Sequence, residues 1–162
     1  GGIITAEKEA LLKDNTLEAV FSLPSEVFYP GAAVNACCML FTLGQPHIKS
    51  DGTTRSTFFC YCKDDGFVKR KNLGRVEQFD MEGNSKWKAI EEEWLDLFER
   101  KASEDGKSAV EKIDADAEWL CEAYMKTDYT KLTNDDFQKT LNNYLAYLVK
   151  EGNVFVKDIE SE

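Results

Sequence analysis

Histidine and proline are scarce in this sequence, which has one histidine and three prolines among its 162 residues. Triad-type hydrolases need a histidine beside a serine or cysteine nucleophile, and His47 stands alone in the sequence. Neither a Gly-x-Ser-x-Gly motif nor a phosphate-binding loop is present. We therefore predict no catalytic residue of these classes, and we expect His47 to lie exposed in a loop.

The cysteines lack the spacing of a zinc site. They are Cys37, Cys38, Cys60, Cys62 and Cys121. Structural zinc usually binds closely spaced Cys-x-x-Cys pairs, which do not occur here, so we predict no metal centre. We interpret the cysteines as reduced, buried thiols, as is typical of a cytosolic protein.

Long apolar runs are also missing. No run approaches the roughly 20 residues of a membrane helix, and the first residues, GGIITAEKEALL, lack the basic and apolar regions of a secretory signal. A hydrophobic content of 43% and an aromatic content of 12% are ordinary for a globular protein. We therefore expect a folded cytoplasmic protein without a membrane partner.

The net charge is −10, and it is unevenly distributed. Residues 1–84 carry 9 basic and 11 acidic side chains, a net −2, whereas residues 85–162 carry 11 and 19, a net −8. An acidic surface repels DNA phosphates. The second half is therefore expected to form a solvated face or a protein contact, not a duplex-binding surface.

Segment 63–75 has the opposite charge, with five basic and two acidic residues. Four of its basic residues, Lys69, Arg70, Lys71 and Arg75, are candidates for contacts with a DNA backbone. The alternative is an exposed hairpin with ordinary charged residues, because a run of charge is usually a solvated surface.

The first half of the chain has the pattern helix, strand, loop, strand. A helix is predicted over residues 5–13, and a strand over 18–23 that stops at Pro24. The run 36–43 is apolar at all positions but one, which predicts a strand covered on both faces. A further strand is predicted over 57–62, followed by a small hairpin region.

Three further helices are predicted, over residues 85–102, over 116–126, and from a capping-box-like start at Thr133 to near Gly152. Their predicted inward stripes are Trp87, Ile90, Trp94, Leu97 and Phe98 in the first, Trp119, Leu120 and Ala123 in the second, and Phe137, Leu141, Tyr144, Leu145 and Leu148 in the third.

The stretch Leu17–Gly44, LEAVFSLPSEVFYPGAAVNACCMLFTLG, carries a family resemblance. A strand ends in Leu-Pro at 22–24, an aromatic Pro-Gly loop follows at 28–31, and a hydrophobic strand begins at 36. This order resembles the late catalytic domain of adenine-N6 DNA methyltransferases, specifically the modification (M) subunit of type I restriction-modification systems. Segments 63–75 and 116–137 resemble the tail of such subunits less specifically.

The resemblance implies an α/β fold. Residues 1–84 would supply the antiparallel end strands of a Rossmann-like methyltransferase sheet and a small hairpin, and residues 85–162 a helical C-terminal region. The family's Asn/Asp-Pro-Pro-Tyr/Phe motif and Gly-rich turn are absent from the sequence. We therefore expect a C-terminal piece of a longer methyltransferase, called the parent enzyme below. The parent would use S-adenosylmethionine, whereas this piece alone would neither bind it nor methylate DNA.

The aromatic-Pro step resembles motif VIII of these enzymes, which gives a flipped base an aromatic face. The resemblance implies that Tyr29, directly before Pro30, is the base-stacking residue, with Phe28 as the alternate. Phe28 is otherwise expected in the core.

The resemblance also implies partners, namely DNA through the parent complex and a specificity subunit or another protein subunit. The alternative hypothesis is a stand-alone interaction module whose acidic helices dock a partner. We expect strand 36–43 to pair antiparallel with strand 18–23, and its free edge to make the isolated piece prone to homodimerisation.

Overall fold

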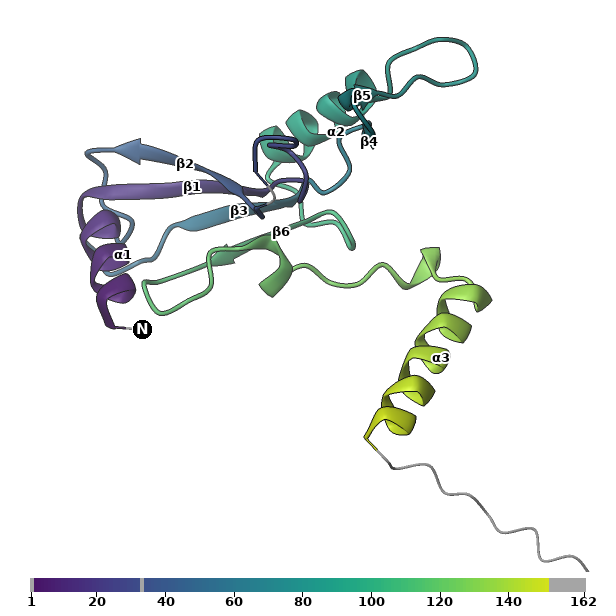
Figure 1. The fold of residues 1–162 in the computed structure, drawn as a ribbon. Helices are drawn as coiled ribbons and strands as arrows, with labels where there is room; N and C mark the ends of the chain where they lie inside the picture. Colours follow the sequence, from purple (N-terminus) through teal and green to yellow (C-terminus); the bar gives the residue numbers. More distant parts are fainter. Residues whose placement is uncertain (1, 33, 152–162) are drawn as a thin grey trace, which may run out of the picture. The chain divides into compact units, whose positions relative to one another are not determined.

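The computed structural model describes residues 2–32 and 34–151 (Figure 1). Its elements are α1 (Gly2–Asp14), β1 (Asn15–Ser22), β2 (Cys37–Leu43), β3 (Ser56–Tyr61), β4 (Phe67–Arg70), β5 (Gly74–Glu77), α2 (Lys86–Arg100), β6 (Ser108–Lys112), the 3₁₀ turns η1 (Cys121–Ala123) and η2 (Tyr129–Lys131), and α3 (Asn134–Lys150). None of these helices combines the length and the apolar character that crossing a membrane requires.

A mixed sheet of four strands in the order β2-β1-β3-β6 forms the centre of the fold. β1 pairs antiparallel with β2 and parallel with β3, and β3 pairs antiparallel with β6. The predicted antiparallel pairing of the first two strands is therefore confirmed, as is a mixed α/β architecture. β6 was not predicted, because Ser108–Lys112 has only two apolar residues and follows a polar break.

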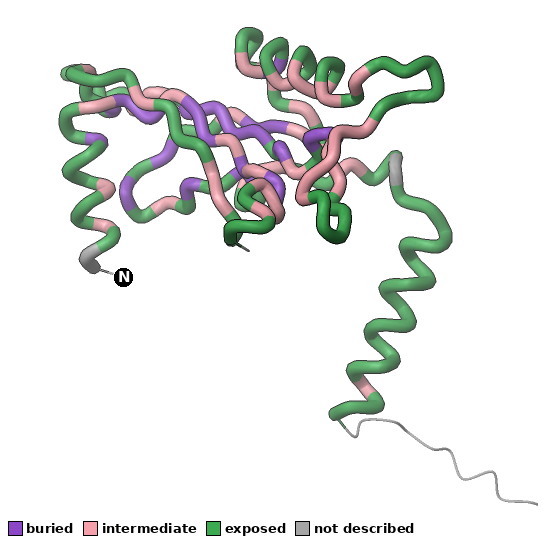
Figure 2. Tube along the Cα trace, turned by 45° about the horizontal axis from the view of Figure 1, so that its top comes forward, coloured by how far each residue is buried: buried purple, intermediate pink, exposed green. Residues whose placement is uncertain are grey.

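Adjacent residues of the central strands point to opposite faces, so each face has its own core. Ala19 and Phe58 pack with Leu97 of α2 on one face. Val20 and Phe59 pack on the other face with residues of α1 and of the segment after β6. The α2 stripe predicted from the sequence thus packs within the chain, and Figure 2 shows the buried residues gathered along β1 and β3.

β2 was predicted to be covered on both faces, and this prediction is wrong. It is an edge strand, and most of its side chains are exposed, including Leu40 at 44% and Leu43 at 79%. Only Phe41 and Cys37 pack against a core, Phe41 beside Trp119. An apolar run therefore identified the strand correctly but not its environment, because its burial depends on neighbours that the described residues do not supply.

The helix predicted over residues 116–126 is wrong. The segment has only the 3₁₀ turn η1, and Leu120 is exposed while Trp119 is buried. The side chain of Asp114 accepts hydrogen bonds from the backbone N–H groups of Asp116 and Ala117, and its carbonyl accepts one from the Trp119 indole. The first two bonds would also suit a helix N-cap, but the Asp114 carbonyl, a helical acceptor, is bonded by the indole, and Trp119 and Cys121 pack into the core.

The chain divides into two compact units after Thr127, not at the boundary expected between residues 84 and 85. β6 and α2 belong to the first unit because they pair with or pack on the sheet. In the second unit, α3 starts with the predicted capping box, in which Thr133 and Asp136 satisfy each other's backbone N–H groups. α3 ends at Lys150, and Gly152, where its end was predicted, lies outside the described residues.

Candidate nucleic-acid interface

The aromatic loop, residues 24–35, leaves the sheet between β1 and β2. Its base is closed by the Leu23 N–H, which donates to the Ala36 carbonyl over 3.0 Å. Within it, the backbone N–H of Val27 bonds to Pro24 and that of Tyr29 to Glu26. The loop is therefore folded by its own turns, which fixes where its aromatic side chains stand.

Phe28 and Tyr29 lie differently from the expectation. Phe28 was expected in the core, but its side chain is 54% exposed, so that expectation is wrong. Tyr29 is the half-buried member of the pair. Because neighbouring residues of a tight turn point in different directions, one aromatic of such a pair is directed to solvent when the other packs on the protein.

The structure brings Tyr29 together with the basic segment. The ammonium nitrogen of Lys69, on β4, lies 4.2 Å from the centre of the Tyr29 ring and 3.1 Å from the Glu26 carboxylate. A cation over an aromatic face is an attractive arrangement. Two candidates from separate parts of the sequence, the aromatic loop and the basic cluster, therefore share one surface.

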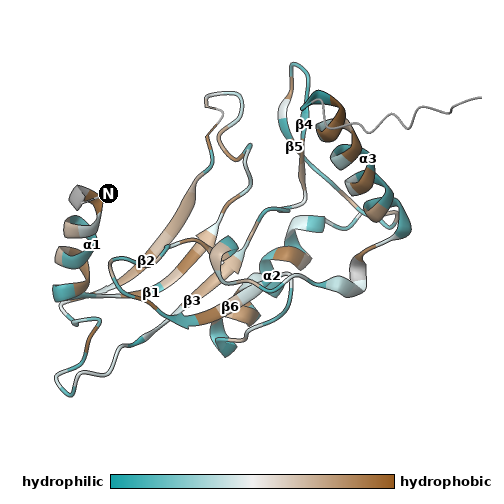
Figure 3. Ribbon diagram, turned by 90° about the horizontal axis from the view of Figure 1, so that it is seen from below, coloured by the Kyte–Doolittle hydropathy of each residue, from teal (hydrophilic) through white to brown (hydrophobic). Residues whose placement is uncertain are grey.

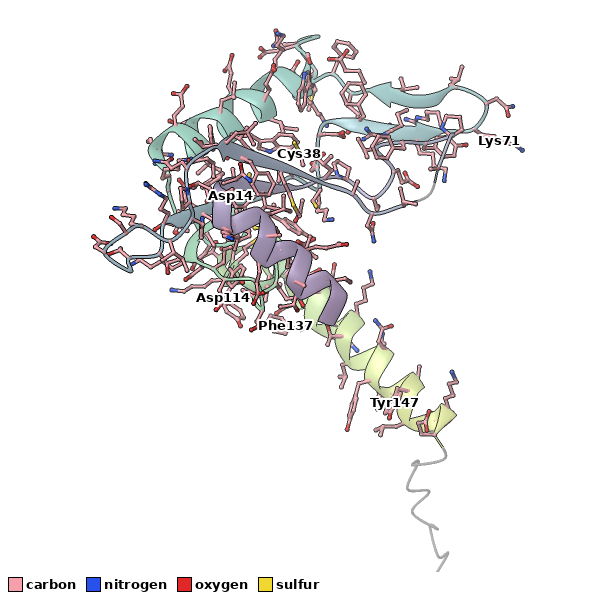
Figure 4. The ribbon with its side chains drawn as sticks, turned by 90° about the vertical axis from the view of Figure 1, so that its left-hand side faces the viewer. Asp14, Cys38, Lys71, Asp114, Phe137 and Tyr147 are labelled. Atoms are coloured by element: carbon pink, nitrogen blue, oxygen red, sulfur yellow. The ribbon has the colours of Figure 1, made fainter. Side chains whose placement is uncertain are left out.

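The β4–β5 hairpin places the other basic candidates in two environments. Arg70 and Lys71 are exposed at its tip, where Figure 4 labels Lys71. Arg75 instead directs one guanidinium nitrogen at both carboxylate oxygens of Asp65, at 2.6 and 2.7 Å, with both side chains largely buried. Arg75 therefore anchors the hairpin, and its charge is already paired.

A polar cluster lies where β1 leads into the aromatic loop. The Ser22 hydroxyl donates to the carboxylate of Glu122, which also pairs with Lys63 at 3.1 Å. Lys63 donates in addition to the carbonyl of Leu23, directly before the loop. Burial would raise the pKa of Glu122, but the hydrogen bonds from Ser22 and Lys63 outweigh it and lower the pKa. No local sequence pattern predicts this cluster, because Glu122 lies 100 residues from Ser22.

The cysteines are free thiols, and three of them, Cys60, Cys62 and Cys121, are buried as predicted. Cys38 is exposed, which corrects the expectation for that residue, because it lies on the edge strand. The Cys62 thiol lies 3.2 Å from the Cys60 sulfur, and this hydrogen bond together with burial raises the pKa of Cys62. Burial raises the pKa of Cys121 to about 12. The described residues contain no group of three or more His, Cys, Asp or Glu side chains that could hold a metal ion.

His47 is buried, which contradicts the prediction that it lies exposed in a loop. Its side chain is 0% exposed, and its backbone N–H donates to the Leu12 carbonyl at the end of α1. Burial lowers the pKa of the imidazole. A hydrogen bond with the backbone of Ile113 raises this pKa, but by less than burial lowers it. The sequence around His47 is a polar loop and gave no signal for this burial. The burial results from the packing of α1 over the loop.

The chain is similar to a curated relative and to a solved structure. The chain is 33% identical, over 145 residues and 88% of its length, to the Type II restriction enzyme and methyltransferase RM.BcgI of Heyndrickxia coagulans. It spans about a fifth (21%) of the length of that relative. The predicted similarity to a restriction-modification methyltransferase is thereby confirmed. No family model matches the sequence.

The solved structure is a modification subunit of a putative type I restriction enzyme from Vibrio vulnificus YJ016. The similarity has a TM-score of 0.44 and 16% sequence identity, and it covers 87% of this chain and 26% of the other.

Proposed function

We propose that this chain is part of an S-adenosylmethionine-dependent adenine-N6 DNA methyltransferase of a restriction-modification system. In this proposal the aromatic loop and the β4–β5 hairpin form the wall of the pocket that receives the extruded adenine. The observation that carries the proposal is the position of the Lys69 ammonium 4.2 Å from the Tyr29 ring. The similarity to a restriction enzyme and methyltransferase supports it.

Each residue has a separate task in this proposal. Tyr29 stacks on the extruded adenine, and since Lys69 covers one face of its ring, the base takes the other face. Lys69, Arg70 and Lys71 meet phosphates beside the extruded nucleotide. Arg75 holds the hairpin in place through Asp65 and makes no phosphate contact.

We propose that S-adenosylmethionine binds outside this chain, so no step here involves it. The sequence has no Gly-x-Gly turn. In the loop between β5 and α2, the Asp80 carboxylate already accepts the backbone N–H groups of Glu82 and Asn84, which leaves no open backbone cradle there. We assign cofactor binding and the chemistry at the target amine to other parts of the parent enzyme.

The proposal also accounts for the edge of β2. In the parent, which would work in the cytoplasm where its DNA substrate lies, a preceding strand of a Rossmann-like sheet pairs with this edge. In the isolated chain the same exposed edge, with Leu40 and Leu43, favours association with a second copy.

A second candidate function is a protein-interaction module, and α3 favours it. This 17-residue helix carries several apolar residues, coloured brown in Figure 3, and those of its apolar stripe are mostly exposed. The exposed members are Phe137, Leu141, Tyr144 and Leu145. A helix with such a stripe is suited to pack against partner helices. We propose the specificity subunit or another protein subunit as that partner, and this role is compatible with the first.

The decisive experiment is single-turnover methylation of an adenine-containing duplex by the parent enzyme. Tyr29→Ala should remove about 1–3 kcal/mol of base stabilisation, which is a loss of about 5- to 150-fold in the methyl-transfer rate. Tyr29→Phe should be nearly neutral, because the ring face and not the hydroxyl contacts the base. Cofactor affinity should stay unchanged in both variants.

Phe28→Ala tests the alternate stacking residue of the same loop. Because Phe28 is exposed, its removal should change the free energy of unfolding by no more than about 0.5 kcal/mol, and the methylation rate should hold. A wild-type rate in Tyr29→Ala, or a loss of activity only in proportion to a loss of folded protein, would show that the loop is not part of the base pocket.

A further inference from the structure

A polar pocket of about 370 Å³ lies at one end of the central sheet. β1 and β3 run parallel and both begin at this end, and the antiparallel β6 ends there at Lys112. The segment 49–56, which leads into β3, completes the wall. The aromatic loop follows the opposite end of β1, so this pocket is separate from the candidate nucleic-acid interface.

Three cations line this pocket, namely Lys49, Arg55 and Lys112. No carboxylate of the described residues forms an ion pair with any of them, although the chain has 30 acidic and only 20 basic residues. Arg55 is half-buried and is held by its Nε, which donates to the Pro46 carbonyl over 3.2 Å. Its terminal guanidinium N–H groups therefore remain available as donors. Positive charge that is gathered in one place and left uncompensated attracts anions.

Two hydroxyl groups add neutral donors to the same wall. Thr54 and Ser56 line the pocket, and neither side chain is hydrogen-bonded to another of the described residues. Ser56 lies directly opposite Lys112 in the pairing of β3 with β6, so their side chains stand on the same face of the sheet. Ammonium, guanidinium and hydroxyl groups are the donors that proteins use for phosphate oxygens.

The carboxylates nearby do not cancel this positive charge. Glu18 is the single carboxylate among the lining residues, which therefore carry a net charge of +2. Glu111 precedes Lys112 but stands on the opposite face of the strand, where burial and the charge of Glu111 raise the pKa of Tyr124. Asp51 lies at the turn of the loop and its carboxylate accepts a backbone N–H there.

We propose that this pocket binds a phosphate group. The group has two sources, the backbone of a nucleic acid and a small phosphate-bearing molecule, and the exposed positions of Lys49 and Lys112 leave the pocket open to both. The proposal is independent of the proposed methyltransferase function, because the cations of this pocket are not those of the hairpin and a phosphate binds here whether or not the chain receives an adenine.

NMR of the ¹⁵N-labelled 162-residue chain tests this proposal. Inorganic phosphate should shift the backbone amide resonances of residues 53–56 with a dissociation constant on the order of millimolar, and sodium chloride at the same ionic strength should not. A short DNA duplex that shifts the same resonances and competes with phosphate would identify a nucleic-acid backbone as the source. Phosphate binding without such competition would identify a small phosphate-bearing molecule. No shift beyond the chloride control with either ligand would overturn the proposal.

Single-charge variants separate the pocket from the overall charge of the chain. Lys112→Gln, at an exposed position, should keep the amide spectrum of the folded chain and weaken phosphate binding about fivefold. Glu18→Gln should strengthen binding by a similar factor, because it removes the one repelling carboxylate of the wall. Lys126→Gln is the matched control, since Lys126 is equally exposed but lies outside the pocket, and binding should not change. Equal losses in Lys112→Gln and Lys126→Gln would refute the pocket, because net charge alone would then explain the binding.

Discussion

β1 and β2 are neighbouring strands that pair antiparallel, with a bulge between Leu17 and Ala19, yet their environments are opposite. Leu17 and Val20 of β1 are fully buried, whereas Leu40 and Leu43 of β2 are 44% and 79% exposed. β1 has a strand on each side and a core on each face, whereas β2 is an edge strand. Position in the sheet, and not residue type, therefore decides how far these leucines are buried.

The largest effect is expected when a leucine of each strand is replaced by alanine. Leu17→Ala should lower the free energy of unfolding by about 2–5 kcal/mol, because it opens a cavity in the core. Leu40→Ala, on the adjacent strand, should cost less than about 1 kcal/mol, because its side chain is 44% exposed. Denaturant unfolding followed by tryptophan fluorescence measures both, since Trp119 lies in the same core. Equal losses in the two variants would contradict the assignment of β2 as an exposed edge.

Two cations of the hairpin also differ in burial: Arg75 is largely buried and Lys69 is exposed. Arg75→Ala leaves the Asp65 carboxylate largely buried without its partner and should cost about 1–3 kcal/mol. Lys69→Ala removes an exposed ion pair with Glu26 and should cost about 0.5 kcal/mol. Thermal unfolding measures the difference, and near-ultraviolet circular dichroism reports on Trp87, which packs beside Phe67 of the hairpin. If Lys69→Ala proves the more destabilising variant, the anchoring role of Arg75 is wrong.

Local signals in the sequence predicted the elements that local chemistry determines. Pro24 marks the end of β1, Ser85 caps α2 through the Lys88 N–H, and the capping box at Thr133 starts α3. Two misses depend on contacts between distant residues. β6 is a strand because it pairs with β3, about 50 residues earlier, and η1 lies in a segment whose Trp119 and Cys121 pack into the core.

The candidate site shows the same limit. The sequence identified Tyr29 and the basic cluster, since an aromatic-Pro step and a run of charge are local patterns. It could not predict that Lys69 lies over Tyr29, that Arg75 is paired with Asp65, or that Glu122 reaches Ser22. The exposure of Phe28 and the burial of His47 were likewise results of tertiary packing and not of composition.

The smallest expected effect concerns His47, a polar loop residue with the burial of a core residue. Its folded-state pKa lies below the ordinary 6.5, chiefly because of burial, so the unfolded chain binds a proton more readily than the folded chain. Stability should therefore be complete above about pH 6.5 and fall as the pH is lowered below it, by at most about 1.4 kcal/mol per pH unit.

The surrounding charges set the limits of this pH effect. Arg55 lowers the pKa of His47 further, whereas the hydrogen bond at the Ile113 backbone and the charge of Glu18 raise it. The test therefore follows the slope of the unfolding free energy against pH between pH 6.5 and 5. Denaturant unfolding at half-unit pH steps measures it, with His47→Gln as the control, because glutamine does not titrate and its curve should be flat. An equal slope in the control would assign the pH dependence to the acidic residues and would remove His47 from the account of stability.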